Sequence, residues 1–187
     1  MPKNSEEDLL PTVWKPWMGD ELVASRVPVT TPTRYVSFRA ALNLRLAGEH
    51  TGDWHKTVFF YTAADNPYTL KLAGPGGLCD STPSLGSKGV RDMAEYLVVM
   101  DVIPEGTGPV WVANHYRAIT DLVLGDVTDL RCTFIPRVAP VYTINQWLDT
   151  EEQIEHLVQE YLVPLTSQLP PEEREVHEQW LPTVVWP

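Results

Sequence analysis

The amino-acid sequence predicts an α+β or α/β domain, because segments with strand character alternate with segments of helical spacing and the chain then becomes wholly helical. A length of 187 residues and an apolar content of 43% suit one compact domain with its own core. We expect a small mixed or antiparallel sheet covered by helices. The predicted layout is an irregular arm with docked tryptophans over residues 1–25, an α+β core over 26–148, and an acidic helical segment over 149–187 of the same domain.

The strands are predicted from short runs that are rich in β-branched and aromatic residues. Residues 26–35 have the pattern of an edge strand, since the prolines in this run cannot donate hydrogen bonds to a ladder. Residues 56–63 and 68–73 are separated by residues typical of a turn and predict a hairpin. Further strands are expected over 134–135 and 138–144.

Helices are predicted where apolar residues recur every three to four positions. The spacing predicts a helix over 38–47 that Ser37 caps, and a short helix over 90–97. A longer helix is expected over 109–125, with Trp111 on its apolar stripe and a glycine at its end.

Two helices are expected in the C-terminal segment. Thr150 and Gln153 have the spacing of a capping box, and the two glutamates between them suit the positive end of a helix dipole. Pro164 is expected to end or kink this first helix, and a second one begins at Pro170. The residues predicted to face the body are Ile154, Leu157, Val158, Tyr161, Val176 and Trp180.

Negative charge is concentrated in this segment. The net charge is −11, and nine of the 25 acidic residues but only one of the 14 basic ones lie between Asp149 and Glu178. A surface of this sign repels nucleic-acid phosphates and attracts basic proteins, although glutamate also simply favours helices and solubility. We therefore expect a protein partner with a basic surface and no direct nucleic-acid contact. The predicted partner-binding residues are Glu151, Glu152, Glu155, Glu172 and Glu173.

A second candidate site is the run from Gly48 to His55, which holds two histidines and two acidic residues. His50, Asp53 and His55 offer two nitrogens and one oxygen to a divalent metal such as zinc, with a position left for water. His115 is the candidate for a further ligand. These residues would make the protein a metal-dependent hydrolase. The alternative is a structural loop without a cofactor, with His115 as a core histidine satisfied by one hydrogen bond.

Arg45 and His50 are separated by four residues, a spacing that resembles the ribonuclease motif of the all-helical HEPN family. The resemblance covers two residues, and Gly48 interrupts the helix that the motif needs. The flanking segments also have strand character, so the resemblance does not enter the predicted fold.

The loop before residue 90 is a third candidate. Ser87, Lys88 and Gly89 precede a predicted helix, where free backbone amides and a lysine could hold an anion such as phosphate. The spacing of a nucleotide-binding loop is absent, and a plain connection is the alternative. Arg117 and Asp121, four residues apart, are expected to form a surface ion pair.

Composition narrows the class of protein. No apolar run is long enough to span a membrane and the first residues are acidic, so we expect a soluble, cytoplasmic protein. Cys79 and Cys132 lie far apart, which excludes a cysteine-rich zinc module. The sequence favours a protein-binding or regulatory protein, for example an inhibitor of a protein that acts on nucleic acid, over the hydrolase.

Overall fold

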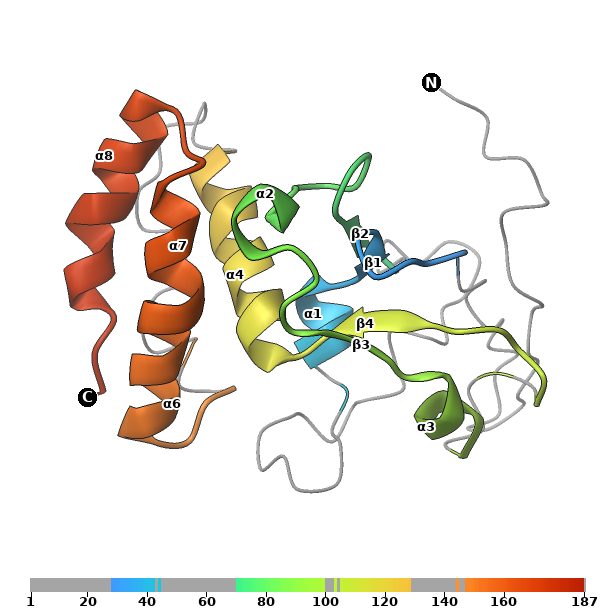
Figure 1. The fold of residues 1–187 in the computed structure, drawn as a ribbon. Helices are drawn as coiled ribbons and strands as arrows, with labels where there is room; N and C mark the ends of the chain where they lie inside the picture. Colours follow the sequence, from blue (N-terminus) through green and yellow to red (C-terminus); the bar gives the residue numbers. More distant parts are fainter. Residues whose placement is uncertain are drawn as a thin grey trace, which may run out of the picture.

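The computed structural model describes residues 28–42, 44, 70–99, 103, 105–128, 144 and 147–186. These residues form an α+β single domain, in which helices pack around a mixed sheet (Figure 1). The predicted fold class is therefore confirmed. No helix in these ranges combines the length and apolar character that crossing a membrane requires.

The sheet contains four described strands in the spatial order β2-β1-β4-β3. The central pair, β1 and β4, is parallel, with Val36 opposite Val112, and both outer pairs are antiparallel. All residues of β1 and β2 are buried, so this end of the sheet belongs to the core. The strands are β1 (Tyr35–Val36), β2 (Leu72–Ala73), β3 (Val90–Asp92) and β4 (Trp111–Ala113).

Helix α4 lies between the sheet and the C-terminal helices (Figure 1). It packs against α1 on one side and against η5 and α8 on the other. Because it is covered on both sides, most of its described side chains are buried. The helices that precede the C-terminal segment are α1 (Phe38–Leu42), α2 (Thr82–Leu85), α3 (Ala94–Val99) and α4 (His115–Thr128).

The C-terminal segment folds back on itself as an antiparallel pair of helical rods, which we call the acidic hairpin (residues 149–186). Its first rod begins at the predicted capping box, which is confirmed: the Thr150 hydroxyl accepts from the Gln153 amide and the Gln153 side chain accepts from the Thr150 amide. The elements are α6 (Glu151–Leu157), the π-helix η5 (Val158–Leu162), α7 (Val163–Thr166), α8 (Pro171–Trp180) and the 3₁₀ turn η6 (Leu181–Thr183).

The predicted buried stripe of the hairpin is confirmed in its main members, since Ile154, Leu157, Tyr161 and Trp180 are buried. Val158 and Val176 are half-buried. The predicted set omits several buried residues, among them His177, which is fully buried beside Trp180 with 5.8 Å between the ring centroids.

One predicted element at the sheet is wrong, and another is confirmed with different boundaries. In the described part of the predicted edge strand over 26–35, Thr31 and Arg34 form a tight turn through mutual backbone hydrogen bonds of 2.7 and 3.1 Å. The strand β1 follows this turn and is central rather than at an edge. The helix predicted over 109–125 begins later, because Trp111 lies in β4, and it continues to Thr128.

Other boundaries also differ. Val90 starts β3, so the helix predicted over 90–97 is confirmed only in α3. Helix α1 covers the first half of the predicted range 38–47. In the predicted hairpin, Leu72 and Ala73 form β2, and residues 56–63 lie outside the described residues, as do those from 134 to 143. Strands of two or three residues are too short for a period to identify them.

Candidate functional site

The predicted metal site falls mostly outside the described residues, which do not include His50, Asp53 or His55. The candidate ligand that the structure does describe is His115. It is buried on the first turn of α4, with its Nε2 at 2.9 Å from the Leu44 carbonyl oxygen. This is the arrangement of a core histidine. Among the described residues, no group of three histidine, cysteine, aspartate or glutamate side chains is placed to hold a metal ion. The metal site stays a prediction.

The predicted anion site depends on a helix that starts after Gly89, and this premise is wrong because strand β3 follows instead. The Gly89 carbonyl oxygen accepts from the Asn114 amide, and the Val90 amide donates to the Ser87 carbonyl oxygen. The Lys88 ammonium donates to the Glu160 carboxylate at 2.5 Å. Lys88 therefore already has an anionic partner within the chain.

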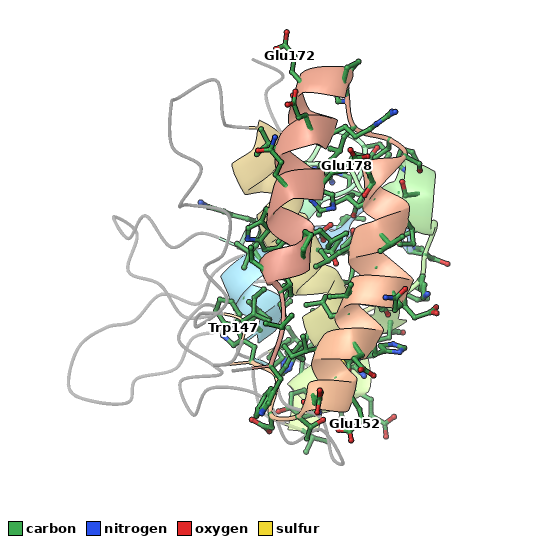
Figure 2. The ribbon with its side chains drawn as sticks, turned by 90° about the vertical axis from the view of Figure 1, so that its left-hand side faces the viewer. Trp147, Glu152, Glu172 and Glu178 are labelled. Atoms are coloured by element: carbon green, nitrogen blue, oxygen red, sulfur yellow. The ribbon has the colours of Figure 1, made fainter. Side chains whose placement is uncertain are left out.

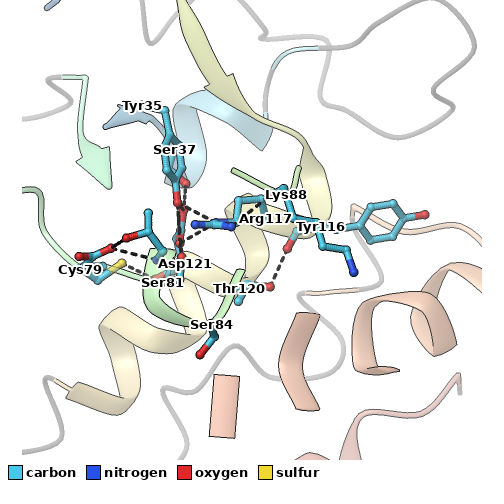
Figure 3. Close-up of polar contacts among 12 residues, drawn as sticks. Tyr35, Ser37, Cys79, Ser81, Ser84, Lys88, Tyr116, Arg117, Thr120 and Asp121 are labelled. Carbon is cyan, nitrogen blue, oxygen red and sulfur yellow. Dashed lines mark hydrogen bonds and ion pairs between the residues drawn. The ribbon is translucent and has the colours of Figure 1, made fainter. Parts of the chain in front are cut away.

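Arg117 and Asp121 are not on the surface, and the predicted exposed ion pair is wrong. Both side chains are 0% exposed, and Arg117 Nε lies 3.6 Å from an Asp121 carboxylate oxygen (Figure 3). Their helix α4 is covered on both sides, so a spacing that usually marks a surface pair lies inside the core. We call this pair and its hydrogen-bond partners the buried polar network.

Three hydroxyl groups complete the network around the carboxylate. The Tyr35 hydroxyl accepts from Arg117 Nε at 2.7 Å and donates to Asp121 at 3.0 Å. Ser37 donates to the same carboxylate oxygen at 2.6 Å, and Ser81 donates to the other one. The carboxylate is therefore bound from β1, from the start of α1 and from the loop before α2.

The two terminal nitrogens of the Arg117 guanidinium group donate to backbone carbonyl oxygens. Its Nη1 donates to the Lys88 carbonyl oxygen at 3.0 Å and its Nη2 to the Gly86 carbonyl oxygen at 3.2 Å. Arg117 thus fixes the turn between α2 and β3 onto α4. Each nitrogen of this buried guanidinium group has a hydrogen-bond partner within the chain, which suits a structural role.

Burial dominates the electrostatics of the network. It raises the pKa of Asp121, while Arg117 and the three hydroxyl donors oppose that shift. Burial and the neighbouring Asp121 carboxylate raise the pKa of Tyr35 and of the Cys79 thiol, which donates to the Asp121 carbonyl oxygen at 3.3 Å. Since a thiol must ionise to act as a nucleophile, Cys79 is not an activated cysteine.

Two polar links fasten the acidic hairpin to the body. Pro164 has no amide hydrogen to donate to the Glu160 carbonyl oxygen one turn earlier, and Lys88 Nζ donates to that oxygen instead at 3.0 Å. The Gln168 side chain bridges the Asp80 carbonyl oxygen at 2.9 Å and the Ser84 amide at 3.2 Å. Helix α7 directly follows the π-helical turn η5 and carries the rod past Pro164 to Thr166. Of the two predicted effects of this proline, an end or a kink, the end is therefore wrong.

The glutamates of the acidic hairpin point outward. Figure 2 shows Glu152, Glu172 and Glu178 along its outer side, and Glu151 and Glu155 are exposed as well. Glu173 differs: it is half-buried, and its Oε2 atom is buried without a hydrogen-bond partner beside a cavity of about 310 Å³. Within the described part of the chain, Lys88 is the cation that pairs with a hairpin carboxylate.

A groove runs along the start of the acidic hairpin, between α6 and the residues that follow η6. Ile154 and Val158, one helical turn apart, form its floor. Val184, Val185 and Trp186 form the facing wall, and the groove has a volume of about 210 Å³. Val185 and Trp186 are 57% and 39% exposed, so this wall is an apolar surface open to solvent. Sequence periodicity could not indicate this groove because its wall is not helical.

Comparisons with known proteins identify no relative. No protein-family model matches the sequence, and searches of curated protein sequences and of solved structures return no significant match. The function is therefore argued from the residues and their geometry.

Proposed function

We propose that this protein is a protein-binding or regulatory protein whose acidic hairpin engages the basic surface of a partner protein. Regulation of a protein that acts on nucleic acid, whose own binding surface is basic, is one form that this function takes. The observation that carries the proposal is the exposed glutamates on α6 and α8, of which Glu151 and Glu155 border an apolar groove.

Charge and exposure support this function. Glu151, Glu152 and Glu155 occupy the first turns of α6, where the helix dipole favours them, and all three carboxylates face solvent. The backbone amide of Glu152 and the Thr150 hydroxyl hold the pKa of the Glu152 carboxyl below its ordinary value, so this charge persists below neutral pH. Uncompensated surface charge of one sign steers an oppositely charged protein toward it.

A contact between proteins also needs apolar surface that is lost from water on binding. The exposed wall of the groove supplies it, and tryptophan is enriched among the residues that dominate binding energy at interfaces. The side chains that surround the Asp121 carboxylate in the buried polar network are, by contrast, 0% exposed and offer no surface to a partner or a substrate. The acidic hairpin is therefore the part of the described chain that combines charge, exposure and a recess.

The test measures association with a lysine-rich peptide of about 15 residues by stopped flow. We expect the association rate constant to fall about tenfold or more between low and physiological salt, because ions screen the attraction. A variant with Glu151→Gln, Glu152→Gln and Glu155→Gln is expected to bind more slowly at low salt and to depend less on salt.

A glutamine-rich peptide of equal length is the control for the probe and is expected not to bind. Rates that ignore both salt and the three substitutions would contradict the proposal, as would the absence of any binding at low salt.

A further inference from the structure

We propose that the groove between α6 and residues 184–186 binds a basic amphipathic helix of the partner protein. The inference rests on the proposed function and makes it specific, because it names both the place of contact and the shape of the partner. It follows from the way in which charged and apolar side chains are arranged across the groove.

The two sides of the groove differ in chemistry. Glu151 and Glu155 line its α6 side, one helical turn apart, directly beside the apolar floor residues Ile154 and Val158. The opposite side is the apolar wall that contains Trp186. An occupant must therefore present cationic groups along one edge and apolar groups beside them.

The two carboxylates, together with the apolar floor residues beside them, favour a helical occupant. Residues four apart on a helix are separated by about 6 Å along its axis, so lysine or arginine at positions i and i+4 of a partner helix matches Glu151 and Glu155. Apolar residues at i+3 and i+7 lie on the adjoining stripe of the same helix and would face the floor and the wall. In an extended segment the neighbouring side chain points to the opposite side, so it would leave the groove.

The size of the groove suits one or two apolar side chains. Its volume of about 210 Å³ exceeds that of the roughly 150 Å³ apolar cavity that admits benzene in another protein. A second copy of this chain is a poor occupant, because a two-fold contact would bring the Glu151 and Glu155 side chains of both copies together.

The test uses three alanine-based helical peptides with the full-length protein. The first carries lysine at i and i+4 and leucine at i+3 and i+7. The second replaces both leucines by serine, and the third replaces both lysines by glutamine. We expect the first peptide to bind at least about tenfold more tightly than the second, because leucine leaves water on binding, and the third to lose the salt dependence.

Protein variants locate the contact. Val185→Ser and Trp186→Ser are expected to remove the preference for leucine over serine peptides, and both side chains are exposed enough that the fold is retained. Val163→Ser is the matched control, since Val163 is 43% exposed on the same hairpin but lies outside the groove. It is expected to bind like the wild-type protein.

Each outcome has a distinct meaning. If leucine and serine peptides bind equally and with the same salt dependence, the groove proposal is overturned while the proposed function stands. If no basic peptide binds at low salt, both are wrong. If sedimentation shows a dimer that Trp186→Ser dissociates, a second copy occupies the groove and the proposal is likewise overturned.

Discussion

The ion pair of Arg117 with Asp121 and the ion pair of Lys88 with Glu160 both contact Lys88, but they differ in how far water reaches them. The Lys88 carbonyl oxygen accepts from Arg117, whose pair with Asp121 is 0% exposed, whereas the Lys88 ammonium pairs with Glu160 in side chains that are 39% and 51% exposed. The chemical groups are similar, but the cost of removing one partner depends on whether water can replace it. The buried polar network therefore holds the fold, whereas the exposed pair contributes little to it.

The largest expected effect comes from breaking the buried pair on one side. Arg117→Met leaves the Asp121 carboxylate buried without its cation, and we expect the free energy of unfolding to fall by about 3–5 kcal/mol. Urea denaturation measures this change. A loss below about 1 kcal/mol would show that water reaches the carboxylate.

The double variant Arg117→Met with Asp121→Leu sharpens this result. Apolar replacement of a whole buried pair is often neutral, but here the Tyr35, Ser37 and Ser81 hydroxyls would lose their common acceptor. Each buried hydroxyl left unpaired costs about 1–3 kcal/mol, so we expect the double variant to stay well below the wild-type stability.

A smaller effect is expected from protonation of His177, which joins α8 to η5. Its Nε2 donates to the Leu162 carbonyl oxygen at 3.0 Å, and its buried Nδ1 has no hydrogen-bond partner in the described structure. Burial lowers its pKa below the ordinary 6.5, against the opposing influences of the Leu162 hydrogen bond and Glu178. The unfolded chain thus binds this proton at a higher pH than the folded chain does.

Stability from this histidine is therefore present above about pH 6.5 and is lost as the pH falls below that value toward the folded-state pKa. Urea denaturation between about pH 7.5 and pH 5 is expected to show this loss. In His177→Gln, whose amide can still donate to Leu162, this part of the pH dependence should disappear. Parallel pH curves for the two proteins would count against the assignment.

A smaller loss of stability is expected when the capping box is removed, because this contact is exposed to solvent although its geometry is fixed. Thr150→Ala removes the acceptor of the Gln153 amide, and we expect a loss of about 0.5–2 kcal/mol in urea denaturation. Thr183→Ala is a matched control, since its hydroxyl donates to the Trp180 carbonyl oxygen at the end of α8 rather than capping a helix start. An unchanged stability of Thr150→Ala would mean that the first turn of α6 frays without cost.

The smallest effect is expected for Lys88→Met. The Lys88 hydrogen bond holds the pKa of Glu160 below its ordinary value, but both groups reach solvent, and water can take the place of the ammonium. We expect a change close to the limit of a urea measurement, and smaller still in high salt. A loss comparable with that of Arg117→Met would show that the carbonyl oxygen freed by Pro164 depends on Lys88 alone.

The sequence predicts local features well where the signal lies within one turn of helix. The capping box at Thr150 and the start of α8 need no information from elsewhere in the chain. Arg117 and Asp121 show the limit: their spacing is the same for an exposed and a buried pair, and only packing on both sides of α4 decides. The partners of the pair lie far away in the sequence: Tyr35 is 82 positions from Arg117 and 86 from Asp121, and Ser81 is 40 positions from Asp121.

The candidate binding site also combines a feature that the sequence predicts with one that depends on packing. The glutamates of α6 are identified by composition and helical spacing, whereas the groove beside them depends on where residues 184–186 return after η6. Glu173 was predicted among the exposed residues and is half-buried, beside a cavity that residues of the loop before α2 also line. Periodicity describes a helix but not what lies next to it.

The parallel pairing of β1 with β4 has a consequence for the order of folding. Val36 meets Val112 only after the chain between them has been synthesised, and closing so long a loop costs entropy before any contact repays it. The acidic hairpin, in contrast, combines contacts between neighbouring segments with contacts of η5 and α8 to α4. Its local turns need no distant residue, but its packing onto α4, like the closure of the sheet, requires segments far apart in the sequence to meet.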